Sequence, residues 1–512
     1  MQPSGHVGSP DGTRSWERAR VHANPTECDE VGPRRPDPGD TGRMRRGWIL
    51  VVGLSACFHP TPPEGAACAN GTDCPDPLIC DLGVCVRSPH DSGVDDDVPI
   101  DVSIDANLTC ACQGATLTCG GVAPVTCALG CMPQNPGARC LEVDPSNGVG
   151  VTAAAGLTTD ITINGGTATF NTDSGAISGV LTRAGGSGVI ADIAFELRTT
   201  GTQGIGVWTF HRLGLNSGAS IRFAGARSAV FVSGTDATIA GTIDGSGGCN
   251  GTDPLCAGPG AGVGGNTALA TGCGPGGSGV AATSGNSDGG GGGGGGRGAG
   301  GAGGLGGGDG TGGLAGIACV APAAEPLVGG AGGGIGSFGA TTACKGGGGG
   351  GALQITAVDM ITVDGTITMG GSGGEGGRAD LVGTNSGAGC GGGAGGSILL
   401  EARTVKVSGT GVLAANGAGG GGGGSFGTAG DRGANGGLTA TPAAGGAAGG
   451  NGGIGGAGAA GNMPAAPGAP ANSNAGAGGG GIGAIYVRTT TGNFTQTGLA
   501  TPTPGTGPLR TQ

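Results

Sequence analysis

Few side chains in this sequence could carry out acid–base or nucleophilic chemistry. Of the histidines that follow Cys57, only His211 lies in the repetitive part of the chain, because His59 and His90 come much earlier. A hydrolytic triad needs a base that an acid holds beside a nucleophile, and the residues around His211 show no such arrangement. We expect His211 to be a surface or packing residue at the end of a strand, and we predict no catalytic residue.

Four aspartates near the turns of repeated segments are the remaining candidates for catalysis. Glycoside hydrolysis uses two facing carboxylates, and because some polysaccharide-degrading enzymes are β-helices, a carbohydrate-active enzyme remains an alternative. The chain lacks the paired aspartates, His-Gly element and Arg-x-Lys signature of polygalacturonases, since two residues separate Arg403 from Lys406. Turn aspartates more often cap or form Asx turns. The four residues are Asp236, Asp244, Asp359 and Asp364.

Calcium binding is a second alternative. The nonapeptide GGxGxDxUx binds calcium between the tandem turns of β-rolls, and the segments Gly303–Asp309 and Gly370–Glu375 resemble it. The aspartate of the first segment comes one position late, the second segment has a glutamate instead, and neither occurs in tandem. The aspartates of residues 88–109 do not follow EF-hand spacing. We therefore predict no metal site and no cofactor.

The cysteines indicate disulfide bonds in an exported protein. The chain has 18 cysteines, and all but Cys28 and Cys57 fall in groups of four, six and six. Even groups suit disulfides, whose pairing stays open at this point. Zinc is the alternative for the first two groups, which lack histidines in finger spacing and paired CxxC knuckles. The disulfide candidates are Cys68, Cys74, Cys80, Cys85, Cys110, Cys112, Cys119, Cys127, Cys131, Cys140, Cys249, Cys256, Cys273, Cys319, Cys344 and Cys390.

A membrane anchor is indicated at Cys57. Met44-Arg45-Arg46 is basic and is followed by a short apolar run, as in a signal peptide. The tetrapeptide Leu54-Ser55-Ala56-Cys57 resembles the lipobox of bacterial lipoproteins. This resemblance implies that the Cys57 thiol carries a diacylglycerol, that the signal peptide is removed, and that acyl chains, palmitate among them, hold the protein at the membrane. Phe58 stands where an inner-membrane retention aspartate would, which favours a surface-exposed outer-membrane lipoprotein.

Composition divides the chain into eight segments. The expected segments are 1–43, a disordered leader or residues before the true start; 44–56, the lipoprotein signal peptide; 57–87, a first cysteine-rich module; 88–109, an acidic linker; 110–145, a second cysteine-rich module; 146–248, strands that form the first solenoid coils; 249–350, a glycine-rich insertion; and 351–512, solenoid coils with glycine-rich insertions.

The body of the chain repeats itself. Three segments each contain a strand, a short turn, a second strand, a third short strand and a glycine-rich excursion, and a fourth copy is truncated. They are Val230–Gly248, Leu353–Gly371, Ile398–Gly417 and Ile482–Arg488. Short strands that recur without helices between them are typical of solenoids whose coils stack apolar faces. The sequence therefore predicts an all-β protein built as a right-handed parallel β-helix, or β-solenoid.

The glycine-rich excursions have a period of three. Glycine occupies every third position from Gly289 to Gly316, and shorter runs cover 421–436 and 446–461. Period three matches the polyproline-II type of helix, which has no internal hydrogen bonds and so needs neighbours. We expect bundled polyglycine-II strands, with flexible loops as the alternative. In composition these blocks resemble the PGRS type of glycine-rich surface protein, without its N-terminal helical domain.

Charge and composition exclude one class of partner. The chain has a net charge of −12 and 3% aromatic residues, whereas nucleic-acid binders need a basic stripe with stacking aromatics. We expect no nucleic-acid partner. An anchor and a repeat body without a catalytic site predict a lipid-anchored envelope protein that acts as a non-catalytic surface scaffold or adhesin. Its expected partners are the membrane, through the lipid, and a polysaccharide, a matrix or a cell-surface ligand.

Overall fold

The computed structural model describes two short strands of the N-terminal region and most of the chain from residue 110. The described parts are Leu78–Asp81, Val84–Arg87 and residues 110–512, except 128, 134–137, 152–153, 155, 201–202, 249–255, 284–286, 338–343 and 380–385. The chain forms two compact units, residues 1–102 and 103–512. In the first, β1 (Leu78–Asp81) pairs antiparallel with β2 (Val84–Arg87), which places Cys80 opposite Cys85.

The second cysteine-rich module is a set of short antiparallel strands joined by disulfides. A three-stranded sheet and a two-stranded hairpin are crossed by the bridges Cys110–Cys119, Cys112–Cys131 and Cys127–Cys140. All six cysteines of this group therefore pair among themselves. The strands are β3 (Cys110–Gln113), β4 (Thr116–Cys119), β5 (Val125–Thr126), β6 (Cys131–Met132) and β7 (Arg139–Cys140).

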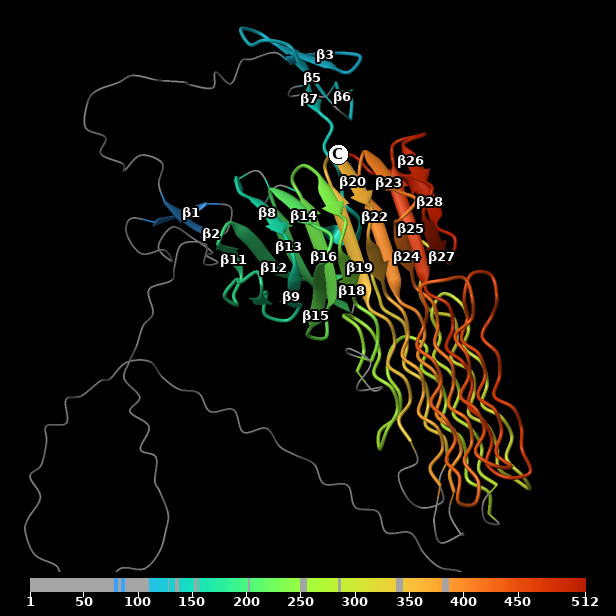
Figure 1. The fold of residues 1–512 in the computed structure, drawn as a ribbon. Coiled ribbons are helices and arrows are strands. Elements are labelled where there is room, and N and C mark those ends of the chain that lie inside the picture. Colours follow the sequence, from blue (N-terminus) through green and yellow to red (C-terminus); the bar gives the residue numbers. More distant parts are fainter. Residues whose placement is uncertain are drawn as a thin grey trace, which may run out of the picture. The chain divides into compact units, whose positions relative to one another are not determined.

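The body is almost entirely β and contains three large sheets, in which nearly all pairs are parallel (Figure 1). Sheet 1 has the order β11-β12-β13-β16-β19-β22-β25-β28, sheet 2 the order β26-β23-β20-β17-β14-β8, and sheet 3 the order β10-β9-β15-β18-β21-β24-β27. The chain passes from sheet 1 to sheet 2 to sheet 3 and returns to sheet 1, so each repeat adds one strand to each sheet. Among the described strands of these three sheets, the antiparallel pairs are β10 with β9, β11 with β12, and β12 with β13.

The four segments that the sequence identified as copies supply strands in register. The strands of sheet 1 are β11 (Gly188–Ile190), β12 (Ile193–Thr200), β13 (Gln203–Phe210), β16 (Ser228–Ser233), β19 (Ala352–Ala357), β22 (Ser397–Glu401), β25 (Ala484–Thr489) and β28 (Gly505–Pro508). Those of sheet 2 are β8 (Asp160–Ile163), β14 (Arg212–Leu215), β17 (Ala237–Ile239), β20 (Met360–Val363), β23 (Thr404–Val407) and β26 (Phe494–Gln496). Those of sheet 3 are β9 (Gly166–Asn171), β10 (Ile177–Gly179), β15 (Ala219–Ala224), β18 (Thr242–Asp244), β21 (Thr366–Thr368), β24 (Val412–Ala414) and β27 (Leu499–Thr501).

The three sheets enclose one apolar core. Alternate residues of each strand point inward, and the register stacks like on like, as where Ile221, Ile243 and Ile367 follow one another in sheet 3. The part of the core that the first repeats enclose contains aromatic rings. Trp208 lies edge-on to Phe170, and their ring centroids are 5.3 Å apart. Such burial of apolar area is the main stabilising term for a sheet assembly. Among the described residues, no helix has the length and apolarity that crossing a membrane requires.

Candidate binding surface

His211 and two of the four candidate aspartates make side-chain contacts between neighbouring repeats. His211 and Asp160 are 2.7 Å apart between Nδ1 and Oδ1, and Arg212 pairs with Asp236 at 3.2 Å. Two repeats further on, Arg403 pairs with Asp359. These contacts link strands of neighbouring repeats, and each of the three carboxylates has a histidine or arginine side chain beside it.

The other two aspartates serve turns. Asp244, on β18, accepts a hydrogen bond from the backbone amide of Ser246 at 3.1 Å, and the carbonyl of Asp364 accepts one from the Thr410 hydroxyl at 2.9 Å. The carboxylates considered for calcium also hold loops. Asp309 accepts hydrogen bonds from the Thr283 hydroxyl and from the Thr283 amide, the latter at 2.9 Å. These two hydrogen bonds hold the pKa of Asp309 below its usual value.

The glycine-rich excursions form an ordered bundle of extended strands. Figure 1 shows them side by side as long wavy strands that run away from one end of the sheets. Strand 288–296 is at the centre and exchanges backbone hydrogen bonds with six neighbours, namely 274–280, 298–304, 313–319, 331–337, 389–392 and 475–481. Successive amides point to different neighbours: Gly292 donates to Gly277 (2.8 Å), Gly293 to Gly301 (2.9 Å) and Gly294 to Gly392 (2.9 Å). The amides of this strand thus use three directions in turn, which repeat every three residues like the glycines of the sequence.

Close approach of the backbones explains why residues 289–296 of the central strand are all glycine. A Cβ at Gly293 would lie 1.9 Å from the carbonyl oxygen of Gly479, and one at Gly292 would lie 2.0 Å from that of Leu314. Every third residue faces the same neighbour, so a strand surrounded on all sides tolerates no side chain. A strand at the surface has one free direction and can carry a side chain there.

Three outer strands use that free direction to build one face of the bundle. Strand 298–306 bonds on one side to 311–317, where Gly303 donates to Gly313 at 2.9 Å, and on the other to 464–471, where Gly468 donates to Ala302 at 2.9 Å. In each strand the exposed residue recurs every third position. The exposed residues, which we call the apolar face, are Thr311, Leu314 and Ile317; Ala299, Ala302 and Leu305; and Pro464, Pro467 and Pro470.

The apolar face is exposed, uncharged and regular. The side chains of Leu314, Ile317 and Leu305 are 80%, 70% and 59% exposed. The nine residues include no acid or base, although the chain as a whole is acidic. Side chains one turn apart on a polyproline-II strand are about 9 Å apart, since each residue advances the strand by about 3.1 Å. Exposed apolar residues that lie together are a common feature of interaction surfaces, so the apolar face is the candidate binding surface.

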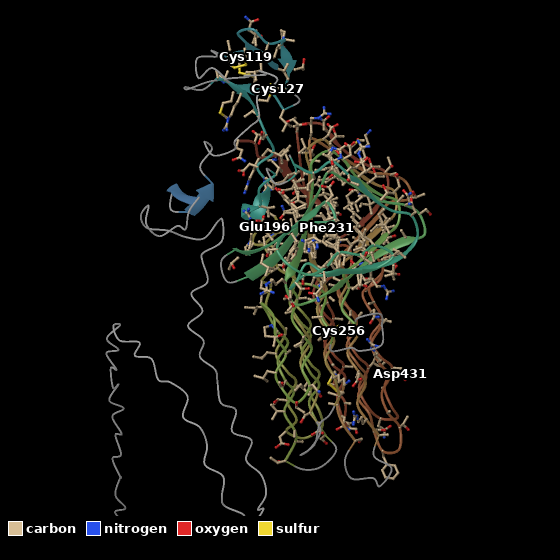
Figure 2. All side chains as sticks on the ribbon, turned by 90° about the vertical axis from the view of Figure 1, so that its left-hand side faces the viewer. Cys119, Cys127, Glu196, Phe231, Cys256 and Asp431 are labelled. Atoms are coloured by element: carbon tan, nitrogen blue, oxygen red, sulfur yellow. A yellow bond between two sulfur atoms is a disulfide. The ribbon has the colours of Figure 1, made fainter. Side chains whose placement is uncertain are left out.

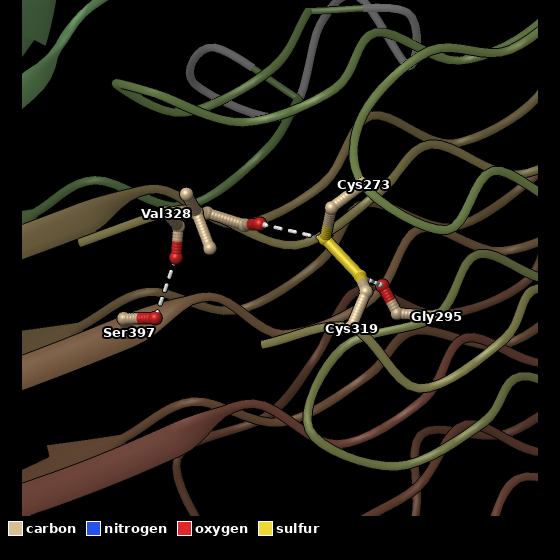
Figure 3. The surroundings of a disulfide bond; sticks show 6 residues. Cys273, Gly295, Cys319, Val328 and Ser397 are labelled. Atoms are coloured by element: carbon tan, nitrogen blue, oxygen red, sulfur yellow. Dashed lines mark hydrogen bonds between the residues drawn. A yellow bond between two sulfur atoms is a disulfide. The ribbon is translucent and has the colours of Figure 1, made fainter. Parts of the chain in front are cut away.

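Two disulfides fasten the bundle strands to one another. Cys273 pairs with Cys319, and Cys344 pairs with Cys390, each across 46 residues. Figure 3 shows the first bridge against the carbonyl of Gly295, near the point where the Ser397 hydroxyl donates to the carbonyl of Val328 at 2.5 Å. Cys256 is also disulfide-bonded. Cys57, Cys68, Cys74 and Cys249 lie outside the described residues.

No protein-family model, no curated protein and no solved structure matches this chain. In the part of the chain that the structure describes, no group of three or more histidine, cysteine, aspartate or glutamate residues is placed to hold a metal ion. The apolar face is the feature that sequence reasoning missed. Its signal was present, because Ala299, Ala302 and Leu305 recur every third position, as do Thr311, Leu314 and Ile317. Only the strand packing shows that these residues face solvent.

Proposed function

We propose that this chain is a non-catalytic, lipid-anchored envelope protein that binds a surface through its glycine bundle. In this proposal Cys57 carries the lipid, the three sheets form a right-handed parallel β-helix, and the bundle projects from its coils. The observation that carries the proposal is the apolar face, a regular array of exposed side chains on a lattice of backbone hydrogen bonds. It favours a scaffold or adhesin over an enzyme, because it supplies contact area without catalytic groups.

Rigidity is the property that suits the bundle to adhesion. Each strand is held by its neighbours at every turn, so little conformational entropy is lost when the face meets a partner, and preorganisation of this kind raises affinity. A rigid face cannot remodel itself around an irregular partner. It fits a ligand that is itself extended and regular, such as a polysaccharide, a matrix polymer or the surface of another cell.

The test is adhesion of a deletion strain that carries the gene back in three forms. The wild-type gene and the control Leu269→Asp, at a residue 73% exposed outside the apolar face, should restore adhesion and matrix assembly. The double variant Leu314→Asp/Ile317→Asp should not, because charges replace the apolar contact. A deletion strain that adheres and assembles its matrix normally would refute the proposal.

A further inference from the structure

A cavity of about 470 Å³ lies where the glycine bundle meets the last repeat of the sheets. Its walls come from three parts of the chain, residues 297–300, residues 459–465, and the segment of Ile482, Pro502 and Thr503 at the ends of the last coils. A volume of this size is within the range of about 300–1,000 Å³ that is typical of ligand sites.

Arg297 gives the cavity a positive charge. Its side chain is exposed and lines the cavity, and none of the described acidic residues forms an ion pair with it. Several arginines of the sheet region, by contrast, form ion pairs, as Arg212, Arg403 and Arg488 do. An arginine without a partner in an acidic protein presents a fork of donors that matches a carboxylate with two parallel hydrogen bonds.

The remaining walls offer both apolar and polar contacts. Met463, Pro464 and Pro502 form apolar surfaces beside Arg297, and Asn462 and Thr503 add an amide and a hydroxyl. Sugar rings present apolar C–H faces and hydroxyl groups to a protein, and these walls supply a counterpart for each. A ligand with an acidic sugar unit would therefore place its carboxylate at Arg297 and its hydroxyls at Asn462 and Thr503.

The cavity is continuous with the apolar face. Ala299 and Pro464 belong to two neighbouring rows of that face and also line the cavity. The strands that carry them run side by side away from the sheets, so a chain that leaves the cavity in this direction lies along the rows. Continuity of a charged pocket with an extended uncharged surface suits a polymer better than a small free acid.

We propose that the Arg297 cavity binds a carboxylate-bearing sugar unit of an extended polysaccharide, whose following units lie along the apolar face. This inference rests on the proposed function and adds its ligand class. Arg297 is the residue that selects the acidic unit, and the side chains of the apolar face provide contact without charge. Binding to the cavity is non-covalent and involves no bond making or breaking.

The test is calorimetric titration of the full chain with an oligomer of galacturonic acid and with the matching neutral oligomer of galactose. The acidic oligomer should bind at least tenfold more tightly than the neutral one, and Arg297→Gln should weaken its binding by about tenfold or more, the loss expected for a charged hydrogen-bonded pair. Arg297→Lys should restore part of the affinity. The control is Arg378→Gln, an exposed arginine of the same bundle that does not line the cavity, and it should leave binding unchanged.

Several outcomes would overturn the inference. They are equal binding of the acidic and neutral oligomers, no binding of the acidic oligomer at millimolar concentration, or equal losses from Arg297→Gln and Arg378→Gln. Equally tight binding of a glutamate hexapeptide would show a site for acidic peptides instead. If these titrations fail while Leu314→Asp/Ile317→Asp still abolishes adhesion, the adhesin function stands and the acidic-sugar inference alone is wrong.

Discussion

The hydroxyl of Ser146 lies 2.5 Å from the carboxylate of Glu401, although 255 residues separate them in the sequence. Glu401 is on β22, on the face of sheet 1 opposite the core, and only 1% of it is exposed. The Ser146 amide and the side chain of Gln354 also donate to this carboxylate, at 3.0 and 2.9 Å. The next residue, Asn147, continues the contact with a hydrogen bond to Gln354 at 2.9 Å. This buried network fastens the segment that enters the body to its middle repeats.

The network makes stability depend on pH in a defined direction. Burial raises the pKa of Glu401, an effect that the hydrogen bonds from Ser146 and Thr356 and the charge of Arg488 offset only in part. Glu401 therefore binds a proton more tightly in the folded state than in the unfolded state, where a glutamate has a pKa of about 4.3. Below the pKa of the unfolded state, the contribution of Glu401 to stability is fully present. It falls as pH rises from there through the raised pKa of the folded state.

Glu401→Gln tests this sign. At pH 4 the substitution should lower the free energy of unfolding by about 1–2 kcal/mol, through less favourable hydrogen bonds in the network. As pH rises to 8 the difference should shrink or reverse, because the wild-type protein then holds a buried charge. Urea unfolding at a series of pH values measures the difference. A gap between variant and wild type that widens with pH would contradict the raised pKa.

The glycine lattice makes a second prediction, about single methyl groups. Gly293→Ala places a Cβ 1.9 Å from the Gly479 carbonyl oxygen, whereas Gly437→Ala meets nothing within 4 Å. The first substitution should cost about 1–3 kcal/mol or more, since overpacking forces backbones apart. The second should change the free energy of unfolding by less than about 0.5 kcal/mol, as at open surface positions.

Thermal or urea unfolding of the two alanine variants, followed by circular dichroism, is the measurement. The pair is matched in residue type, and both positions lie in glycine-rich excursions. Equal, small effects at both positions would mean that the strands are not packed as closely as the lattice requires, and that loose loops describe them better.

Local sequence patterns predicted the strands and the glycine period of this fold. Contacts between segments far apart in the sequence could not be predicted. Alternation in segments such as Leu353–Gly371 follows from the two-residue period of a strand, and the glycines from Gly289 to Gly316 follow a three-residue backbone period. Both periods are properties of one segment, so they are visible in the sequence. The docking of Ser146 on Glu401 joins residues in different patterns, and nothing local indicates it. The Arg297 cavity depends in the same way on segments 297–300 and 459–465 meeting.

The bridge between Cys344 and Cys390 makes the last prediction. Cys344 is 4% exposed and Cys390 is fully buried, and the bridge joins two bundle strands on either side of a segment that contains β19, β20 and β21. Removing it with Cys344→Ser/Cys390→Ser should cost about 2–5 kcal/mol, because the unfolded chain regains the entropy of the open loop. The loss should fall mainly on the bundle, since the hydrogen bonds of the sheets do not depend on the bridge.

Amide hydrogen exchange measures the stability of the bundle and of the sheets separately. Glycine amides such as that of Gly391, which donates to the Gly334 carbonyl at 2.8 Å, should exchange faster in the variant, while amides of β19 and β22 keep their protection. Equal acceleration in both parts would show that the bundle and the sheets unfold as one cooperative unit, and unprotected bundle amides in the wild type would refute the ordered lattice itself.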